Sequence, residues 1–242
     1  MTGKIALVTD ALHFIGESSA KALTDDGFTV LCHDEGFSGD KTRARFGAEH
    51  PRLVALEAQT PEDIRSAIET DYGRIDVLVN NDAYPAEKVA IDDVTSDILE
   101  TTFNHLLFRP YLLTAALVPM MKDAKQGKII FVSSAAPLRG LPNYSVYVTA
   151  RGAANALAQT LAQELGRWNI QVNALAPNFV ESPTYFPPSL MENPEVRNKI
   201  LSRIPLGRLG KQEEAAAAVA FLASENASFI TGHVIPFAGG WA

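Results

Sequence analysis

Short apolar runs alternate with amphipathic stretches along nearly the whole chain. The first run, residues 5–8, is separated by a polar loop and a helical stretch from the second run, residues 28–33. Short runs of this kind are typical of strands that are buried on both faces of a parallel sheet. The order strand, helix, strand therefore predicts a βαβ unit with a right-handed crossover. Further strands are expected at residues 53–56, 75–80, 128–132, 170–176 and 234–237.

Helices are expected between these strands. Thr60 precedes Pro61 and two acidic residues, a pattern that favours a helix start because Thr caps the first turn and Pro fits its first position. The longest expected helix spans residues 97–121, where Pro110 and Pro119 should bend or shorten it. Other helices are expected at 17–26, 41–48, 147–167, 194–204 and 211–223, and a loop rich in proline and aromatic residues at 177–193. About seven parallel strands with helices on both faces predict the α/β class. We expect a single doubly wound Rossmann-like domain over residues 1–242.

Composition and charge narrow the classes of partner. The net charge is −7 and the pI is about 5.3, which argues against a nucleic-acid surface. The single cysteine, Cys32, excludes an intrachain disulfide and fits a reducing compartment, so we expect a cytoplasmic protein. No run approaches the roughly 18 apolar residues of a membrane span, and the five histidines form no recognisable metal-ligand pair.

Three side chains near the middle of the chain are candidates for catalysis. Ser134 follows the expected strand at 128–132, twelve residues separate it from Tyr147, and three residues separate Tyr147 from Arg151. Positions i and i+4 share one face of a helix, so the phenol and the guanidinium should lie side by side. A hydroxyl, a phenol and a fixed cation would then converge on one small oxygen-bearing substrate. The alternative is that Ser134 only caps a turn and Tyr147 only packs.

These motifs resemble the short-chain dehydrogenase/reductase superfamily, whose catalytic signature is Ser, twelve residues, Tyr, three residues, Lys. Arg151 stands where that superfamily has lysine, and arginine is a permanently charged group that cannot join a proton relay. The set Ser134, Tyr147 and Arg151 looks like the triad of the halohydrin (haloalcohol) dehalogenases, a branch that uses no nicotinamide. Residues 80–82 stand where the superfamily has Asn-Asn-Ala, and Asn104 is matched to its helix asparagine.

The loop after the first strand departs from the dinucleotide-binding pattern of the superfamily, Thr-Gly-x-x-x-Gly-x-Gly. Asp10 and Phe14 replace the first two glycines, and only Gly16 remains. A carboxylate and a ring would occupy the space where backbone should approach a pyrophosphate, so we expect no cofactor. Asp34 is placed like an acid that binds an NAD ribose, but we interpret it as an inherited or solvated surface acid. His13 is interpreted as a loop histidine satisfied by backbone rather than a partner for substrate.

The resemblance also implies a halide site in the space of the absent nicotinamide. Ring edges of Phe14, Phe179 and Phe186 and the N–H groups of Phe179 and Val180 would suit a large, weakly hydrated anion. The alternative is a merely hydrophobic substrate loop. The residues assigned to this halide and substrate site are Phe14, Pro177, Asn178, Phe179, Val180, Tyr185 and Phe186.

The function implied by the resemblance is a cofactor-independent carbon–halogen lyase. Such an enzyme converts vicinal haloalcohols to epoxides and halide, and in reverse opens epoxides with azide, cyanide or nitrite. Two alternatives remain open: an NAD(P)-dependent short-chain oxidoreductase with a degenerate loop, and a non-catalytic ligand-sensing module. The resemblance further implies association through the helices at 97–121 and 147–167, and the second is rich in small residues that let another helix approach closely, so we expect a homotetramer. The sequence leaves open whether Trp241 contacts a neighbouring subunit.

Overall fold

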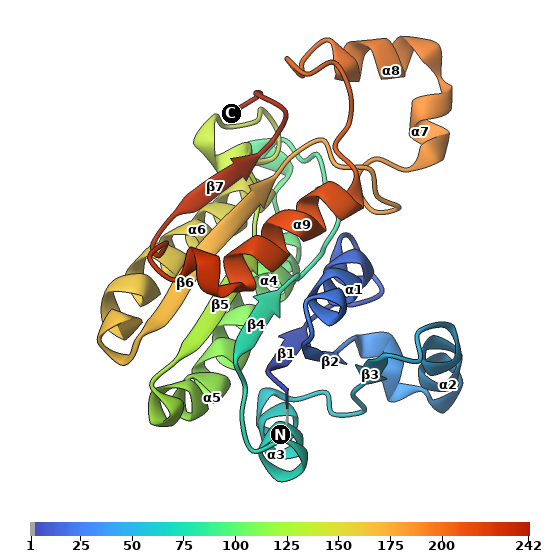
Figure 1. Cartoon of the computed structure of the whole chain (residues 1–242). Coiled ribbons are helices and arrows are strands. Elements are labelled where there is room, and N and C mark those ends of the chain that lie inside the picture. The colour runs from blue at the N-terminus through green and yellow to red at the C-terminus, as the bar shows by residue number, and fades with distance from the viewer. Residues whose placement is uncertain (1–2) are drawn as a thin grey trace.

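Seven strands form one parallel sheet at the centre of the molecule (Figure 1). The structure is a computed structural model, and it describes residues 3–242. The strands are β1 (Ile5–Val8), β2 (Thr29–Cys32), β3 (Leu53–Ala55), β4 (Val77–Asn80), β5 (Gly127–Val132), β6 (Ile170–Pro177) and β7 (Val234–Phe237). Their order is β3-β2-β1-β4-β5-β6-β7, and every neighbouring pair is parallel. The predicted α/β fold with about seven parallel strands is confirmed.

The chain changes direction across the sheet between β1 and β4. From β1 the strands run outward to β3, and from β4 they run the other way to β7. At such a reversal the loops at the carboxyl ends of the strands diverge and leave a crevice, which is where doubly wound proteins bind ligands. The register pairs Val8 with Val79 and Val132 with Leu175, so the loops after β1, β4, β5 and β6 all emerge at this one edge.

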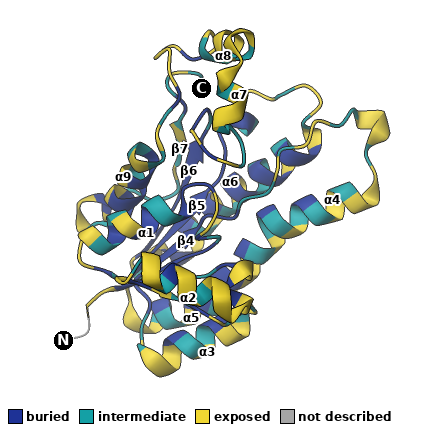
Figure 2. Ribbon diagram, turned by 90° about the vertical axis from the view of Figure 1, so that its right-hand side faces the viewer, coloured by how far each residue is buried: buried dark blue, intermediate teal, exposed yellow. Residues whose placement is uncertain are grey.

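Two layers of helices cover the sheet because successive strand residues point to opposite faces. Ala6 and Val8 pack on the side of α1 (Gly16–Asp25), α2 (Asp40–Glu49) and α9 (Gln212–Ala223). Ile5 and Leu7 pack on the side of α3 (Pro61–Asp71), α5 (Arg109–Ala124) and α6 (Ser145–Leu165). The buried colouring in Figure 2 runs through the strands and the inward faces of these helices. No helix among residues 3–242 is long and apolar enough to cross a membrane.

The predicted start of α3 is confirmed in atomic detail. The Thr60 side chain accepts a hydrogen bond from the backbone N–H of Asp63 at 3.1 Å, and Pro61 occupies the first turn. The hydroxyl satisfies one of the N–H groups that a helix start leaves unpaired, and proline has no N–H to leave unpaired.

The long helix expected at 97–121 is not continuous. It is divided into α4 (Ser96–Phe103), a π-helical turn (Asn104–Phe108) and α5, which continues past Pro119 to Ala124. Pro110 follows the wide turn at once, and it cannot donate the hydrogen bond that a regular helix needs there. Asn104, matched in the sequence to the helix asparagine of the superfamily, lies exposed at the start of this turn. The buried residue of the turn is Leu106, which packs with Tyr147 and Ala150.

The stretch 177–193 is not wholly a loop. Its second part forms the short helix α7 (Pro188–Glu192), which is followed by α8 (Pro194–Leu201). Pro188 and Pro194 each sit in the first turn of their helix, where their fixed φ favours helix entry. In Figure 1 the two helices project beyond the carboxyl edge of the sheet, above β7.

Candidate active site

Ser134 and Tyr147 face one cavity of about 780 Å³ at the carboxyl edge of β5 and β6. Ser134 follows the end of β5, and Tyr147 lies in the first turn of α6. Both side chains are buried, with 4% and 9% of their surface exposed. The sequence spacing thus brings a hydroxyl and a phenol to one concave site.

Ser134 caps a turn and also lines the cavity. Its Oγ accepts a hydrogen bond from the backbone N–H of Ala136 at 3.1 Å, so it does cap a turn. Because that bond uses a lone pair, the hydroxyl hydrogen stays available for an oxygen in the cavity. The neighbouring Ser133 donates from its Oγ to the backbone oxygen of Arg151 at 3.1 Å and so ties α6 to the end of β5. Sequence reasoning gave Ser133 no role.

Arg151 lies behind Tyr147 and does not line the cavity. It is 2% exposed, and its guanidinium lies 5.4 Å from the centre of the Tyr147 ring. Its Nη1 donates to the backbone oxygen of Val132 at 3.0 Å, and its Nη2 donates to that of Asp82 at 2.9 Å. Burial acts to lower the pKa of Arg151, but interactions with Tyr147 and Tyr185 outweigh it and the pKa is raised. Arg151 is therefore a fixed, oriented positive charge beside the phenol.

The seven residues assigned to the halide and substrate site all line the same cavity. They are Phe14, Pro177, Asn178, Phe179, Val180, Tyr185 and Phe186. Phe14 meets Tyr185 edge to face at 5.1 Å, and Phe179 meets Phe186 at 5.5 Å. The cavity therefore has an aromatic wall whose members come from the first loop and from the segment after β6.

One of the two backbone donors expected for a halide is already engaged. The N–H of Phe179 donates to Oδ1 of Asn178 at 2.9 Å, so the expectation that it faces an anion is wrong. Asn178 directly precedes Phe179, so its side-chain oxygen can reach this N–H without help from a distant segment. The Asn178 side chain lines the cavity and has its amide hydrogens left to donate, so it replaces Phe179 as a candidate donor beside Val180.

Tyr185 links the aromatic wall to Arg151. Its hydroxyl accepts from Nη2 of Arg151 at 3.2 Å and donates to the backbone oxygen of Tyr84 at 3.0 Å. Burial, with repulsion from a charged Tyr147, raises the pKa of Tyr185, so this phenol stays neutral. Its position shows that it also braces Arg151, a contact that sequence spacing could not reveal because the two residues lie on distant segments.

Known proteins are similar to this chain over nearly its whole length. A family model described as enoyl-(acyl carrier protein) reductase matches residues 11–242. The 3-oxoacyl-(acyl-carrier-protein) reductase of Thermotoga maritima is 33% identical, covering 99% of this chain and 98% of the relative. That of Escherichia coli is 31% identical, with 98% and 97% covered. The chain belongs to the short-chain dehydrogenase/reductase superfamily.

Solved structures similar to this chain include a dehalogenation enzyme and a halohydrin dehalogenase. A protein described as a dehalogenation enzyme superposes with a TM-score of 0.96 at 44% identity, covering 99% of this chain and 98% of that one. A halohydrin dehalogenase bound to ethyl (2S)-oxiran-2-ylacetate gives 0.95 at 37% identity, with 98% and 96% covered. The resemblance to halohydrin dehalogenases within the superfamily is therefore confirmed over the whole chain.

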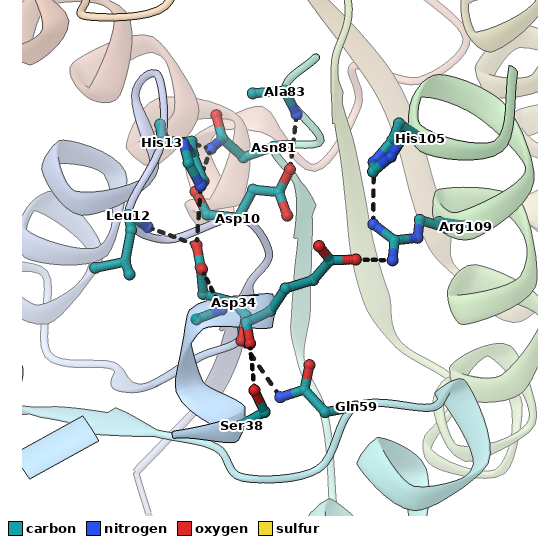
Figure 3. A network of polar contacts seen from close by, with 12 residues as sticks. Asp10, Leu12, His13, Asp34, Ser38, Gln59, Asn81, Ala83, His105 and Arg109 are labelled. Carbon is teal, nitrogen blue, oxygen red and sulfur yellow. Dashed lines mark hydrogen bonds and ion pairs between the residues drawn. The ribbon is translucent and has the colours of Figure 1, made fainter. Parts of the chain in front are cut away.

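The first loop keeps a left-handed backbone at the two positions where Asp10 and Phe14 replace glycines of the superfamily pattern. Asp10 and Phe14 have φ values of 43° and 45°, in the left-handed region that glycine favours. The Asp10 carboxylate accepts from the N–H of Ala83 at 2.9 Å, and Nδ2 of Asn81 donates to the backbone oxygens of Asp10 and His13, both at 3.0 Å. Burial and repulsion from Asp34 raise the pKa of Asp10, although the Ala83 bond opposes them. These bonds tie the loop to the segment after β4, as Figure 3 shows.

The sequence suggested that Asp34 is an inherited or solvated surface acid, but its side chain is buried and not solvated. It is 2% exposed, and its two oxygens accept from the N–H groups of Leu12 at 3.0 Å and Gly36 at 2.9 Å. The acid therefore binds its own chain at the position where a ribose hydroxyl would lie. His13 points its imidazole toward Asp34, with Nε2 at 3.9 Å, and it does not line the cavity. A role for His13 as a substrate partner is excluded by that placement.

Two further features of this region were missed by sequence reasoning. Arg109 of α5 pairs with Glu35 and contacts Nδ1 of His105 at 3.1 Å. It thereby links α5 to the residue that follows Asp34 (Figure 3). Asp82 is buried beneath Asp10, and burial together with repulsion from Asp10 raises the pKa of Asp82 well above its usual range. The only signal for Asp82 was its departure from the superfamily alanine.

Trp241 packs against its own chain. Its ring meets Phe179 edge to face at 5.6 Å, and its backbone oxygen accepts from Nη1 of Arg139 at 2.7 Å. It thereby lines the same cavity as Ser134. Among residues 3–242 no cluster of three or more His, Cys, Asp or Glu side chains is arranged to hold a metal ion.

Proposed function

We propose that this protein is a cofactor-independent carbon–halogen lyase that converts vicinal haloalcohols to epoxides and halide. The observation that carries the proposal is the combination of a cavity presenting Ser134 and Tyr147 with a first loop filled by Phe14 and Asp10. A hydroxyl-binding site is open, whereas the neighbouring groove for a dinucleotide is occupied by protein.

The reaction needs one proton transfer and one displacement. Ser134 donates a hydrogen bond to the substrate hydroxyl and orients it. Tyr147, as phenolate, takes the hydroxyl proton, and the Arg151 charge beneath its ring stabilises that phenolate. The alkoxide oxygen attacks the adjacent carbon from the side opposite the halogen. The new C–O bond closes the epoxide, and the halide leaves with the electrons of the C–X bond.

The aromatic wall supplies the site for the leaving halide. Ring edges carry the positive part of the aromatic quadrupole, and a weakly hydrated anion suits such a wall with a few N–H donors. Asn178, Val180 and Phe186 are the residues to which we assign these contacts. In the reverse direction, azide, cyanide or nitrite would enter the same site and open an epoxide.

The direct test is halide release by the pure protein without cofactor. Incubation with a brominated vicinal alcohol should release bromide and form the epoxide in equal amounts. Tyr147→Phe serves as the inactive control, because it keeps the ring and removes the base. No bromide release from any of a panel of vicinal haloalcohols would reject the lyase.

The second candidate is an NAD(P)-dependent reductase, and the observation in its favour is the identity of 31–33% to the two acyl-carrier-protein reductases. Calorimetric titration with NADH and NADPH separates the two. The lyase proposal expects no saturable binding at millimolar cofactor, since Asp10 and Phe14 occupy the phosphate region. A micromolar dissociation constant would favour the reductase.

A homotetramer belongs to the proposal, although its sequence argument needs correction. Most of the small residues of α6 are buried within the subunit, where Ala158 and Ala162 pack against the sheet. The better support is a set of exposed apolar side chains on α4, α5 and the turn between them: Leu99, Phe108, Tyr111 and Leu112. A monomer in sedimentation equilibrium at micromolar concentration would contradict the assembly.

A further inference from the structure

The charged residues that line the cavity are both arginines. They are Arg139 and Arg203, and no aspartate or glutamate lines the cavity beside them. The whole chain, by contrast, has a net charge of −7. The approach to Ser134 and Tyr147 therefore has the opposite sign to the protein as a whole.

The two arginines come from different parts of the fold. Arg139 follows the short turn Ala136–Leu138, five residues after Ser134, and Arg203 follows α8 at the far end of the segment after β6. Both side chains are exposed, so they belong to the mouth of the cavity rather than to its floor. Ser134 and Tyr147 lie deeper, with 4% and 9% exposure.

Neither charge is neutralised within the chain. No carboxylate of residues 3–242 lies within 4.0 Å of Arg139 or Arg203. Arg208, five positions beyond Arg203, makes a useful contrast, because both its terminal nitrogens bind Glu214 at 2.7 Å. The two arginines of the cavity thus keep donors that an incoming anion can use.

Arg139 is also held in place. Its Nη1 donates to the Trp241 backbone oxygen at 2.7 Å, and its guanidinium lies 4.9 Å from the centre of the Trp241 ring. One N–H of five is used by that bond, so a second edge of the planar group remains for a ligand. A restrained arginine loses less rotamer freedom when it binds a carboxylate than a free one would.

We propose that the preferred substrates carry a carboxylate on the chain that extends from the carbinol carbon, and that Arg139 and Arg203 bind it. The inference rests on the proposed lyase function and names the substrate class for that site. Cavities of about 300–1,000 Å³ enclose ligands of drug size, so about 780 Å³ leaves room beyond a three-carbon haloalcohol. The guanidinium fork matches a carboxylate in shape as well as charge.

The expected kinetic effect is mainly on KM. The carboxylate lies away from the reacting atoms, and its contacts are the same before and during epoxide closure. Such uniform binding lowers KM with little change in kcat. Partly solvated arginine–carboxylate pairs are modest, so we expect an acid to exceed its methyl ester by about tenfold in kcat/KM, which corresponds to about 1.4 kcal/mol.

The experiment compares bromohydrin acids with their methyl esters at two chain lengths, 4-bromo-3-hydroxybutanoate and 8-bromo-7-hydroxyoctanoate. Bromide release is followed for the wild type, Arg139→Gln, Arg203→Gln and the double variant. The acid-to-ester ratio of kcat/KM should fall toward one in the double variant, and Arg139→Lys should restore part of it. Arg167→Gln is the matched control, because Arg167 also stacks on a tryptophan, Trp168 at 3.8 Å, but lies before β6 at the opposite end of the sheet.

The outcomes separate this inference from the function on which it rests. If neither acids nor esters release bromide, both fail. If esters react but acids show no preference at either length, or keep their preference in the double variant, the carboxylate site fails and the lyase stands. A third arm measures kcat/KM for azide with a neutral epoxide. An equal fall for azide and for the acid would mean that the arginines attract free anions and would overturn the assignment to a substrate carboxylate.

Discussion

The two halves of the carboxyl edge of the sheet differ in what their side chains face: other groups of the chain in one half and an open cavity in the other. Beside β1 and β2, polar groups bind one another: Asp10 takes the N–H of Ala83, and Asp34 takes those of Leu12 and Gly36. Beside β5 and β6, Ser134 and Tyr147 face an open cavity of about 780 Å³. A doubly wound sheet offers a crevice across its whole switch point. The side chains of the loops decide which part of that crevice stays open.

The first prediction removes the base from the open half and carries the largest effect. Tyr147→Phe should lower kcat/KM for a bromoalcohol by at least about a thousandfold at every pH, since a positioned base contributes up to about 10⁴-fold. Tyr147 is 9% exposed and the ring is retained, so the melting temperature should change little. Activity within tenfold of the wild type would show that another group takes the proton.

The second prediction tests whether a fixed charge supports that base. A free tyrosine has a pKa of about 10, so only about one in a thousand is ionised at neutral pH. Arg151→Met should move the ascending limb of the pH profile of kcat/KM, which reports ionisation of the base, to higher pH, and part of the activity should return above about pH 9. Arg151→Lys keeps a charge but loses the fork, and should lose much activity without gaining reductase activity.

The control for Arg151 is stability, because the side chain also has a structural role. Removing it leaves the backbone oxygens of Val132 and Asp82 without their donors, at a cost of about 1–3 kcal/mol for each buried group. Thermal melts of each variant therefore accompany the kinetics. If Arg151→Met is well folded and the ascending limb of its kcat/KM profile stays at the wild-type pH, the charge assignment is contradicted.

The third prediction concerns the aromatic wall. Phe186→Ala should weaken competitive inhibition by bromide several-fold, because it removes one ring from the assigned halide site. Phe186 is only half-buried and lies on a loop, so the loss of stability should be smaller than for a core phenylalanine. Phe229→Ala, at a ring that is fully exposed, is the matched control. Unchanged bromide inhibition would move the halide to another part of the cavity.

The smallest expected effect lies in the closed half. The pKa of Asp82 is raised, so the folded state holds its proton more tightly than the unfolded state does. That contribution to stability is present at pH values below about 3.9 and is lost as pH rises through the folded-state pKa. The free energy of unfolding of Asp82→Asn, relative to the wild type, should therefore increase between pH 4 and pH 7. Asp92→Asn, at an exposed acid, is the control, and a difference that is flat or falls with pH would contradict the sign.

The sheet was predictable from the sequence because its strands are buried on both faces and read as apolar runs. The placement of Ser134 and Tyr147 in one cavity, with Arg151 beside the phenol, was also predictable, since the strand end fixes Ser134 and helical spacing fixes Tyr147 and Arg151. The division of the long helix was not, because Pro119 leaves its helix intact whereas Pro110 follows a π-helical turn. Sequence alone does not distinguish the two prolines.

Burial of polar groups was the main source of error. Asp34 was interpreted as solvated because the N–H of Leu12, which it binds, belongs to a loop 22 residues away. The N–H of Phe179 was assigned to a halide because nothing in the sequence shows that the side chain of Asn178 accepts its hydrogen bond. Both errors concern contacts of the folded chain that the order of residues does not specify.

The left-handed backbone at Asp10 and Phe14 bears on how readily mutation could open this loop to a dinucleotide. Glycine at either position would relieve about 1–2 kcal/mol of strain, so the loop itself presents little obstacle. The surrounding bonds are the obstacle: Asp34 would have to release Leu12, and Arg109 would have to leave Glu35. Opening the loop would therefore need several substitutions together, and glycine at Asp10 or Phe14 alone should leave it closed.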